Sequence, residues 1–92
     1  MDKMQKLQLM DKILRELDDL KNSQTSVLKK VTQVETENIN LGIPLLDKEL
    51  PEIHENIDKG IEHVSSLADE FKTYRDKFSA DNKLEEQPAA NS

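Results

Sequence analysis

The sequence predicts an all-α protein built as a long helical hairpin. Apolar residues recur at alternating steps of three and four along most of the 92 residues, while the chain contains only two Gly and three Pro. The spacing is that of amphipathic helices with a coiled-coil seam, and so few turn residues cannot serve a multi-stranded sheet. The chain is also short for a domain, so we expect a single unit.

The first predicted helix covers about residues 3–40. With Met10 taken as heptad position a, the ten a and d positions between residues 10 and 41 are apolar except Gln24 and Asn38. An additional apolar column at position e makes the stripe wider than a two-stranded seam, so this helix should contact more than one neighbour. The interface or core residues predicted here are Leu7, Met10, Ile13, Leu14, Leu17, Leu20, Val27, Leu28, Val31, Val34 and Leu41.

Two polar features interrupt this stripe. Gln24 and Asn38 occupy a positions, where a buried polar residue favours the one register in which it finds a partner. The alternative for each is simple hydration, which for Asn38 would follow from its place near a helix end. The polar run at residues 22–26 has weak helix propensity. It therefore gives an alternative in which the first helix is broken in two, although the heptad phase passes through the run unchanged.

A turn is predicted at residues 41–44, because the two heptad series are out of phase there. The first series ends with Leu41 at position d and the second opens with Ile43 at position a. Between them, Gly42 can adopt the left-handed conformation that ends a helix, and Pro44 suits the first turn of the next helix. Two segments of similar length around a short connection favour an antiparallel hairpin.

The second predicted helix covers about residues 45–79. Eleven consecutive a and d positions run from Ile43 to Phe78, and only Gly60 among them is not apolar. Pro51 lacks an N–H group, so the helix should start near it or kink there. The interface or core residues predicted here are Leu46, Leu50, Ile53, Ile57, Val64, Leu67, Phe71, Tyr74 and Phe78. The hairpin unit is expected over residues 1–80, followed by a disordered acidic and polar tail over residues 81–92.

The net charge and the lack of long apolar stretches argue against nucleic-acid binding and membrane insertion. The net charge of −6 and the pI of about 4.8 argue against direct nucleic-acid binding, which requires a basic surface. Neither a signal peptide nor a stretch apolar enough to cross a bilayer is apparent, so we expect a soluble cytoplasmic protein without membrane insertion.

Candidate catalytic and metal-binding patterns are weak. His54, Asp58 and Glu62 are spaced i, i+4, i+8, but the second histidine of a zinc-protease motif is missing. Ser65 and Ser66 follow His63 by two and three residues, yet such neighbours on one helix cannot build a catalytic triad with an oxyanion hole. We therefore expect no enzymatic activity, no metal and no cofactor.

The sequence instead predicts a coiled-coil interaction or assembly module. Its partner would be a second copy, giving a four-helix bundle, or other helical subunits of a complex. Charges at g and e positions, such as Glu16 with Lys21, would also suit a parallel dimer, although pairs within one helix compete with that explanation. The alternative function is an acidic regulatory decoy that blocks a basic or nucleic-acid-binding protein.

Overall fold

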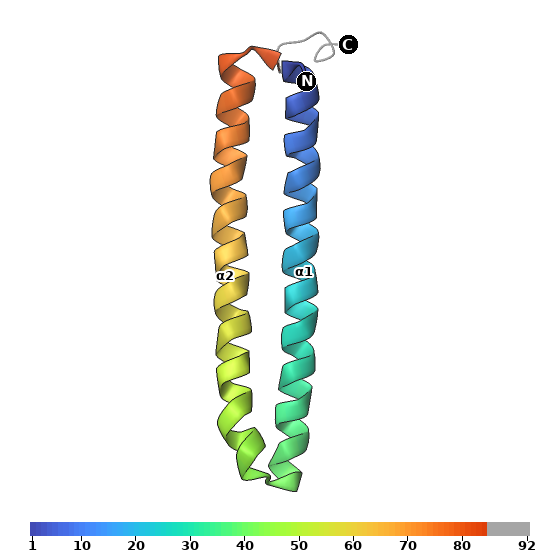
Figure 1. Ribbon diagram of the computed structural model, residues 1–92, viewed down its shortest axis with the longest axis vertical. Coiled ribbons are helices and arrows are strands. Elements are labelled where there is room, and N and C mark those ends of the chain that lie inside the picture. Colours follow the sequence, from blue (N-terminus) through green and yellow to red (C-terminus); the bar gives the residue numbers. More distant parts are fainter. Residues whose placement is uncertain (85–92) are drawn as a thin grey trace.

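The computed structural model describes residues 1–84 and consists of two antiparallel helices, α1 (Lys3–Leu41) and α2 (Pro44–Asp81), joined by a short turn (Figure 1). The helices pack against each other along their whole length, and the molecule measures 62 × 21 × 20 Å. A helix of 39 residues is about 58 Å long at 1.5 Å per residue, so the hairpin is one helix long and two helices wide. The predicted helical hairpin is confirmed. The predicted tail falls largely on residues 85–92, which lie outside the described residues.

The start of α1 is set by a capping box. The Gln5 N–H donates to Asp2 Oδ1 at 2.7 Å, and the Asp2 N–H donates to Gln5 Oε1 at 2.9 Å. These bonds satisfy two backbone groups that a helix start leaves without partners. The helix then continues through residues 22–26 without the break that their polar composition offered. Thr25 Oγ donates to the Lys21 carbonyl at 3.0 Å, so this polar side chain bonds within the helix.

The turn is held by Asn38 and Gly42. Gly42 has φ 66° and ψ 37°, and its N–H donates to the Asn38 carbonyl, which ends α1 in the left-handed conformation expected of glycine. The Asn38 side chain is only 4% exposed. It accepts from the Ile43 N–H at 3.0 Å and donates to Asp47 Oδ1 at 2.7 Å. Pro44 is the first residue of α2, and the helix passes through Pro51.

The two helices face each other through their a and e columns. In α1, Leu7, Leu14 and Leu28 of column e turn toward α2 together with column a, and all three are buried or half-buried. Two contacts between the helices fix the register: an ion pair in which Arg75 Nε lies 2.7 Å from Asp11 Oδ1, and a hydrogen-bond contact in which His54 Nδ1 lies 2.9 Å from Glu35 Oε1. Among the described residues, Leu7 and Leu50 are the only large apolar residues that are buried, at 5% and 9% exposed. The hairpin therefore has a thin core.

Neither of the two helices in the described part of the chain is both long and apolar enough to cross a membrane.

Candidate protein interaction surface

An apolar surface lies on one side of the hairpin, where both helices present their d columns. With a and e facing the other helix, position d lies about 80° to one side of the seam, since successive residues are about 100° apart. Because the helices are antiparallel, the two d columns come to the same side. We call this surface the d face. It consists of Ile13, Leu20 and Val27 of α1 and Ile53, Gly60, Leu67 and Tyr74 of α2.

The apolar side chains of the d face are exposed to solvent. Leu20 is 47% exposed, Leu67 is 49% exposed and Tyr74 is 61% exposed. Isolated exposed apolar residues are common on proteins, but these recur every seven residues on both helices. They form one strip along the length of the hairpin.

A groove runs along the middle of the d face. Its main section has a volume of about 510 Å³ and is open to solvent, and a neighbouring section of about 260 Å³ continues it toward Leu67. Gly60 lies in both sections, where its missing side chain deepens the groove. A Cβ at Gly60 would lie 3.1 Å from Gln24 Nε2, so Gln24 occupies the space opposite this glycine. The main section is lined by Leu20, Ser23, Gln24, Val27, Ile53, Asn56, Ile57 and Gly60.

The opposite side of the seam is polar over the middle of the hairpin. We call this surface the b face, because it is formed by the b columns. It consists of Asp18, Thr25 and Thr32 of α1 and Asp58, Ser65 and Lys72 of α2. The hollow on this side is lined partly by charged side chains, including Asp18, Lys21, Asp69 and Lys72. Both faces lie at the same angle from the seam, so the hairpin is amphipathic across its width.

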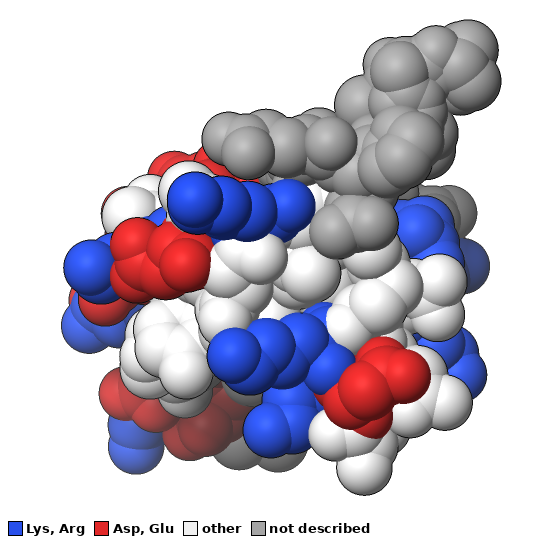
Figure 2. Space-filling view, turned by 90° about the horizontal axis from the view of Figure 1, so that it is seen from above, with Lys and Arg blue, Asp and Glu red and all other residues white. Residues whose placement is uncertain are grey.

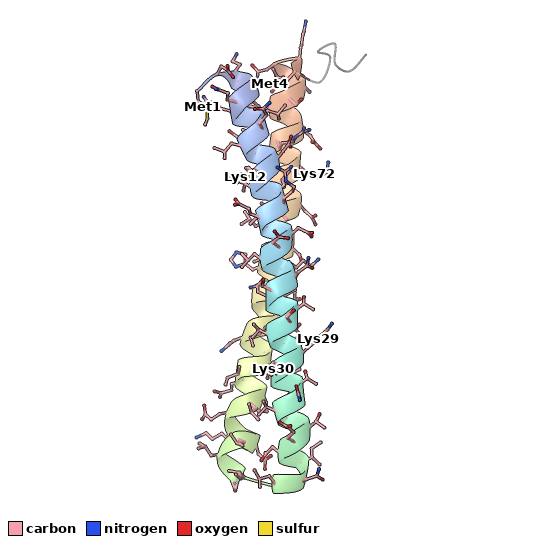
Figure 3. All side chains as sticks on the ribbon, turned by 90° about the vertical axis from the view of Figure 1, so that its right-hand side faces the viewer. Met1, Met4, Lys12, Lys29, Lys30 and Lys72 are labelled. Carbon is pink, nitrogen blue, oxygen red and sulfur yellow. The ribbon has the colours of Figure 1, made fainter. Side chains whose placement is uncertain are left out.

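Charged side chains at position g border the d face. Glu16, Lys30 and Glu37 of α1 and Glu49, Glu70 and Lys77 of α2 are all exposed. Among the described residues, Lys77 alone of these six forms an ion pair within the chain, with Asp81 at 3.5 Å. Other long polar side chains, such as Lys12 and Lys29, project from α1 into solvent (Figure 3). Seen from the end that carries the N-terminus, Lys and Arg lie beside Asp and Glu (Figure 2).

Ion pairs on the outer surface perturb two carboxyl groups. A hydrogen bond from Lys72 and a second from Arg75 lower the pKa of Asp76. Lys59 bonds Glu55 at 2.9 Å, which lowers the pKa of Glu55 and raises that of Lys59. These groups lie on solvated helix surfaces, away from the groove.

The predicted interface residues divide into two sets. Those at positions a and e pack between the helices, where each is buried or half-buried: Leu7, Met10, Leu14, Leu17, Leu28, Val31, Leu50, Ile57, Val64, Phe71 and Phe78. Those at position d lie beside the seam, where Val34 and Leu46 are half-buried and the rest are exposed: Ile13, Leu20, Val27, Leu41, Ile53, Leu67 and Tyr74.

The two polar a residues have different surroundings. Asn38 bonds the turn, as described above. Gln24 borders the groove, and its Oε1 atom is buried without a hydrogen-bond partner. A buried acceptor left without a donor is costly, so this atom requires an explanation.

The residues considered for chemistry do not come together. His54 contacts Glu35 of the other helix at 2.9 Å. Within residues 1–84, no group of three His, Cys, Asp or Glu side chains is arranged to hold a metal ion.

Sequence reasoning missed the contacts between the helices made by the e column of α2. Asp47, His54 and Arg75 occupy this column and bond Asn38, Glu35 and Asp11 of α1. A signal was present, because the column places charged groups at the same heights in the hairpin as polar or oppositely charged groups of α1.

No protein family model, curated protein or solved structure matches the chain.

Proposed function

We propose that this protein is a non-enzymatic interaction module that binds helical protein partners through its d face. The observation that carries the proposal is the alignment of both d columns into one exposed apolar strip with a groove along it. Folding of the hairpin leaves these residues about half exposed, since the centre of the seam is made by columns a and e. Full burial of an exposed aliphatic or aromatic side chain contributes about 1.5–3 kcal/mol, so covering the exposed half of each residue in the strip is favourable by roughly half that amount.

The shape of the strip supports a helical partner. Its side chains repeat every seven residues, which corresponds to about 10.5 Å along a helix axis. A helix lying in the groove presents side chains at the same interval and can pack between them. The groove is open along its length, whereas small-molecule sites enclose most of their ligand.

The charges around the strip favour a protein over a membrane surface. Helices that lie on anionic membranes carry Lys and Arg on the polar side. Here the border of the d face carries both signs, with Glu16 and Lys30 on α1 and Glu49 and Lys77 on α2. The net charge of −6 would also oppose binding to anionic lipid.

Photo-crosslinking from the two faces tests this proposal. A photoreactive amino acid is placed at Val27 on the d face or, as the matched control, at Thr32 on the b face of the same helix. In native cells, we expect crosslinks to protein from position 27 and few from position 32. Equal crosslinking from both positions, or none from either, would contradict the proposed function.

Salt dependence separates this function from the acidic decoy. A decoy bound through its acidic surface loses affinity steeply as salt rises, because its binding energy is electrostatic. Binding through the d face should change little between low and physiological salt, since it depends on apolar burial. A steep loss of the position 27 crosslinks with added salt would favour the decoy instead.

A further inference from the structure

We propose that the d face binds a second copy of this chain, forming an antiparallel four-helix bundle. The inference rests on the proposed function and names its partner. The two hairpins would be related by a two-fold axis that is perpendicular to the helices. The axis crosses the middle of the hairpin, where it lies beside Ser23 and Gln24 of α1. On α2 it lies beside His63 and Val64. In this arrangement α1 packs on the partner's α1 and α2 packs on the partner's α2.

The d face is self-complementary in shape about this axis. On α2, Gly60 comes opposite the partner's Leu67, so a large side chain meets a residue that has none. Ile53 comes opposite the partner's Tyr74. On α1, Leu20 comes opposite the partner's Val27. Each apolar residue of the strip thus meets an apolar residue or Gly60 of the partner, so pairing removes apolar surface of both hairpins from water.

The bordering charges are also self-complementary about this axis. Glu16 comes opposite the partner's Lys30, and Glu49 comes opposite the partner's Lys77. The symmetry repeats both contacts, so the dimer has two of each. Opposite charges at the border of a helical interface select orientation more than they add stability.

The same faces could instead pair about an axis parallel to the helices, which would place α1 on the partner's α2. That arrangement brings Glu16 against the partner's Glu70 and Glu37 against the partner's Glu49. Both contacts join like charges, and like charges directly opposite are destabilising. The charge pattern therefore favours the perpendicular axis.

Parallel pairing of single helices is disfavoured for a different reason. It would need the e residues Glu35 and Arg75 to pair with g residues of the partner. Within the hairpin, these two side chains already contact His54 and Asp11. The e column is thus engaged by the intramolecular seam.

Gln24 supplies a second, independent observation. Its Oε1 is buried without a hydrogen-bond partner in the hairpin, and the residue lies at the proposed axis. There it meets the partner's Gln24, and two carboxamides related by a two-fold axis can each donate an N–H to the oxygen of the other. Because Oε1 has almost no accessible surface in the hairpin, the Gln24 side chain would turn toward the axis in the dimer, where its oxygen would gain the donor that the hairpin does not provide.

The contact area is sufficient for a stable dimer. Because the axis passes the middle of both helices, the hairpins overlap over almost their full length, about 50 Å at 1.5 Å per residue. With a width of 20 Å, each hairpin contributes on the order of 1,000 Å². The total of roughly 2,000 Å² is at the upper end of standard protein interfaces, which bury about 1,200–2,000 Å².

Disulfide formation locates the axis. The described residues contain no free cysteine, and the full sequence has none, so each introduced thiol is unique. Ser23→Cys lies beside its symmetry mate at the axis and should form a covalent dimer under mild oxidation. Ser26→Cys is the matched control, since it lies at nearly the same height but points away from the partner. An axis parallel to the helices would instead place position 23 beside the partner's position 63. If a mixture of Ser23→Cys and His63→Cys chains forms more mixed disulfide dimers than Ser23→Cys dimers, the proposal is overturned.

Charge reversal tests the contacts at the border of the interface. We expect Glu16→Lys to weaken the dimer by about tenfold, because two attractive contacts become repulsive. Adding Lys30→Glu to the same chain should restore the affinity. Glu37→Lys changes the net charge equally but faces no charge across the proposed interface, so its effect should be small. Tighter association of Glu16→Lys would indicate the parallel axis and overturn the proposal.

The outcomes separate this inference from the proposed function. If position 27 crosslinks to other proteins in cells while Ser23→Cys gives no covalent dimer, the d face is an interaction surface but its partner is not a second copy. If neither position 27 crosslinks nor Ser23→Cys dimers form, both proposals fail.

Discussion

The d face and the b face lie on opposite sides of the same seam, at the same angle from it and on the same two helices. One carries Leu20, Val27 and Leu67, and the other carries Asp18, Thr32 and Lys72. Val27 and Thr32 make the contrast sharpest, because their side chains have nearly the same shape and both are exposed. The difference supports the proposal that the d face has a role beyond folding of the hairpin.

The largest expected effect on dimer affinity comes from a charge placed on the d face, compared with a charge placed on the b face. Val27→Asp should raise the dissociation constant of the dimer at least 100-fold, because two buried valines are lost and two carboxylates are desolvated, costing at least about 3 kcal/mol together. Thr32→Asp should change it less than about threefold, since position 32 stays in water. Sedimentation velocity over a dilution series measures both. Equal effects of the two variants would contradict the distinction between the faces.

Truncating two leucines of α1 separates the seam from the d face. Leu28 is half-buried against α2, so Leu28→Ala should cost about 2 kcal/mol of unfolding free energy even in dilute protein. Leu20 is exposed in the hairpin, so Leu20→Ala should cost less than about 0.5 kcal/mol under the same conditions.

At high protein concentration the cost of Leu20→Ala should increase, because the wild-type dimer buries this residue. Denaturant unfolding at two protein concentrations measures the change. A concentration-independent cost for Leu20→Ala would count against burial of the d face.

The sequence predicted the helices and the turn because those depend on local signals. Heptad spacing and the Gly42–Pro44 connection each act within a few residues. Which of the three apolar columns face the other helix is not decided by local signals. Columns a, d and e were all visible, but which pair forms the seam depends on how the turn rotates α2 against α1. Contacts such as Asn38 with Asp47 and Asp11 with Arg75 set that rotation, and they join residues on different helices.

Asn38→Ala tests whether the Asn38 side chain stabilises the turn. Loss of the bonds to Ile43 and Asp47 should cost about 1–3 kcal/mol, because buried groups lose their partners. Asn40→Ala is the control, since Asn40 is exposed and close in sequence. Thermal unfolding measures the difference, and similar costs for the two variants would show that Asn38 does not hold the turn.

The smallest expected effect concerns the outer surface. The pKa of Asp76 is lowered in the folded protein by Lys72 and Arg75, so this carboxyl stabilises the fold above its unfolded pKa, and the contribution is lost as pH falls through its folded pKa. Between neutral and acidic pH, Asp76→Asn should therefore show a slightly smaller fall in Tm than the wild type. Asp69→Asn, on the same helix surface, is the control, and an identical fall for all three proteins would show that Asp76 contributes nothing.

Sedimentation equilibrium of the unmodified chain tests the central claim most directly. The chain has a mass of 10.6 kDa, and pairing of two d faces predicts a single species of about twice that mass, with little change between low and physiological salt. A helical protein that remains at 10.6 kDa at every accessible concentration would contradict pairing of the chain with itself.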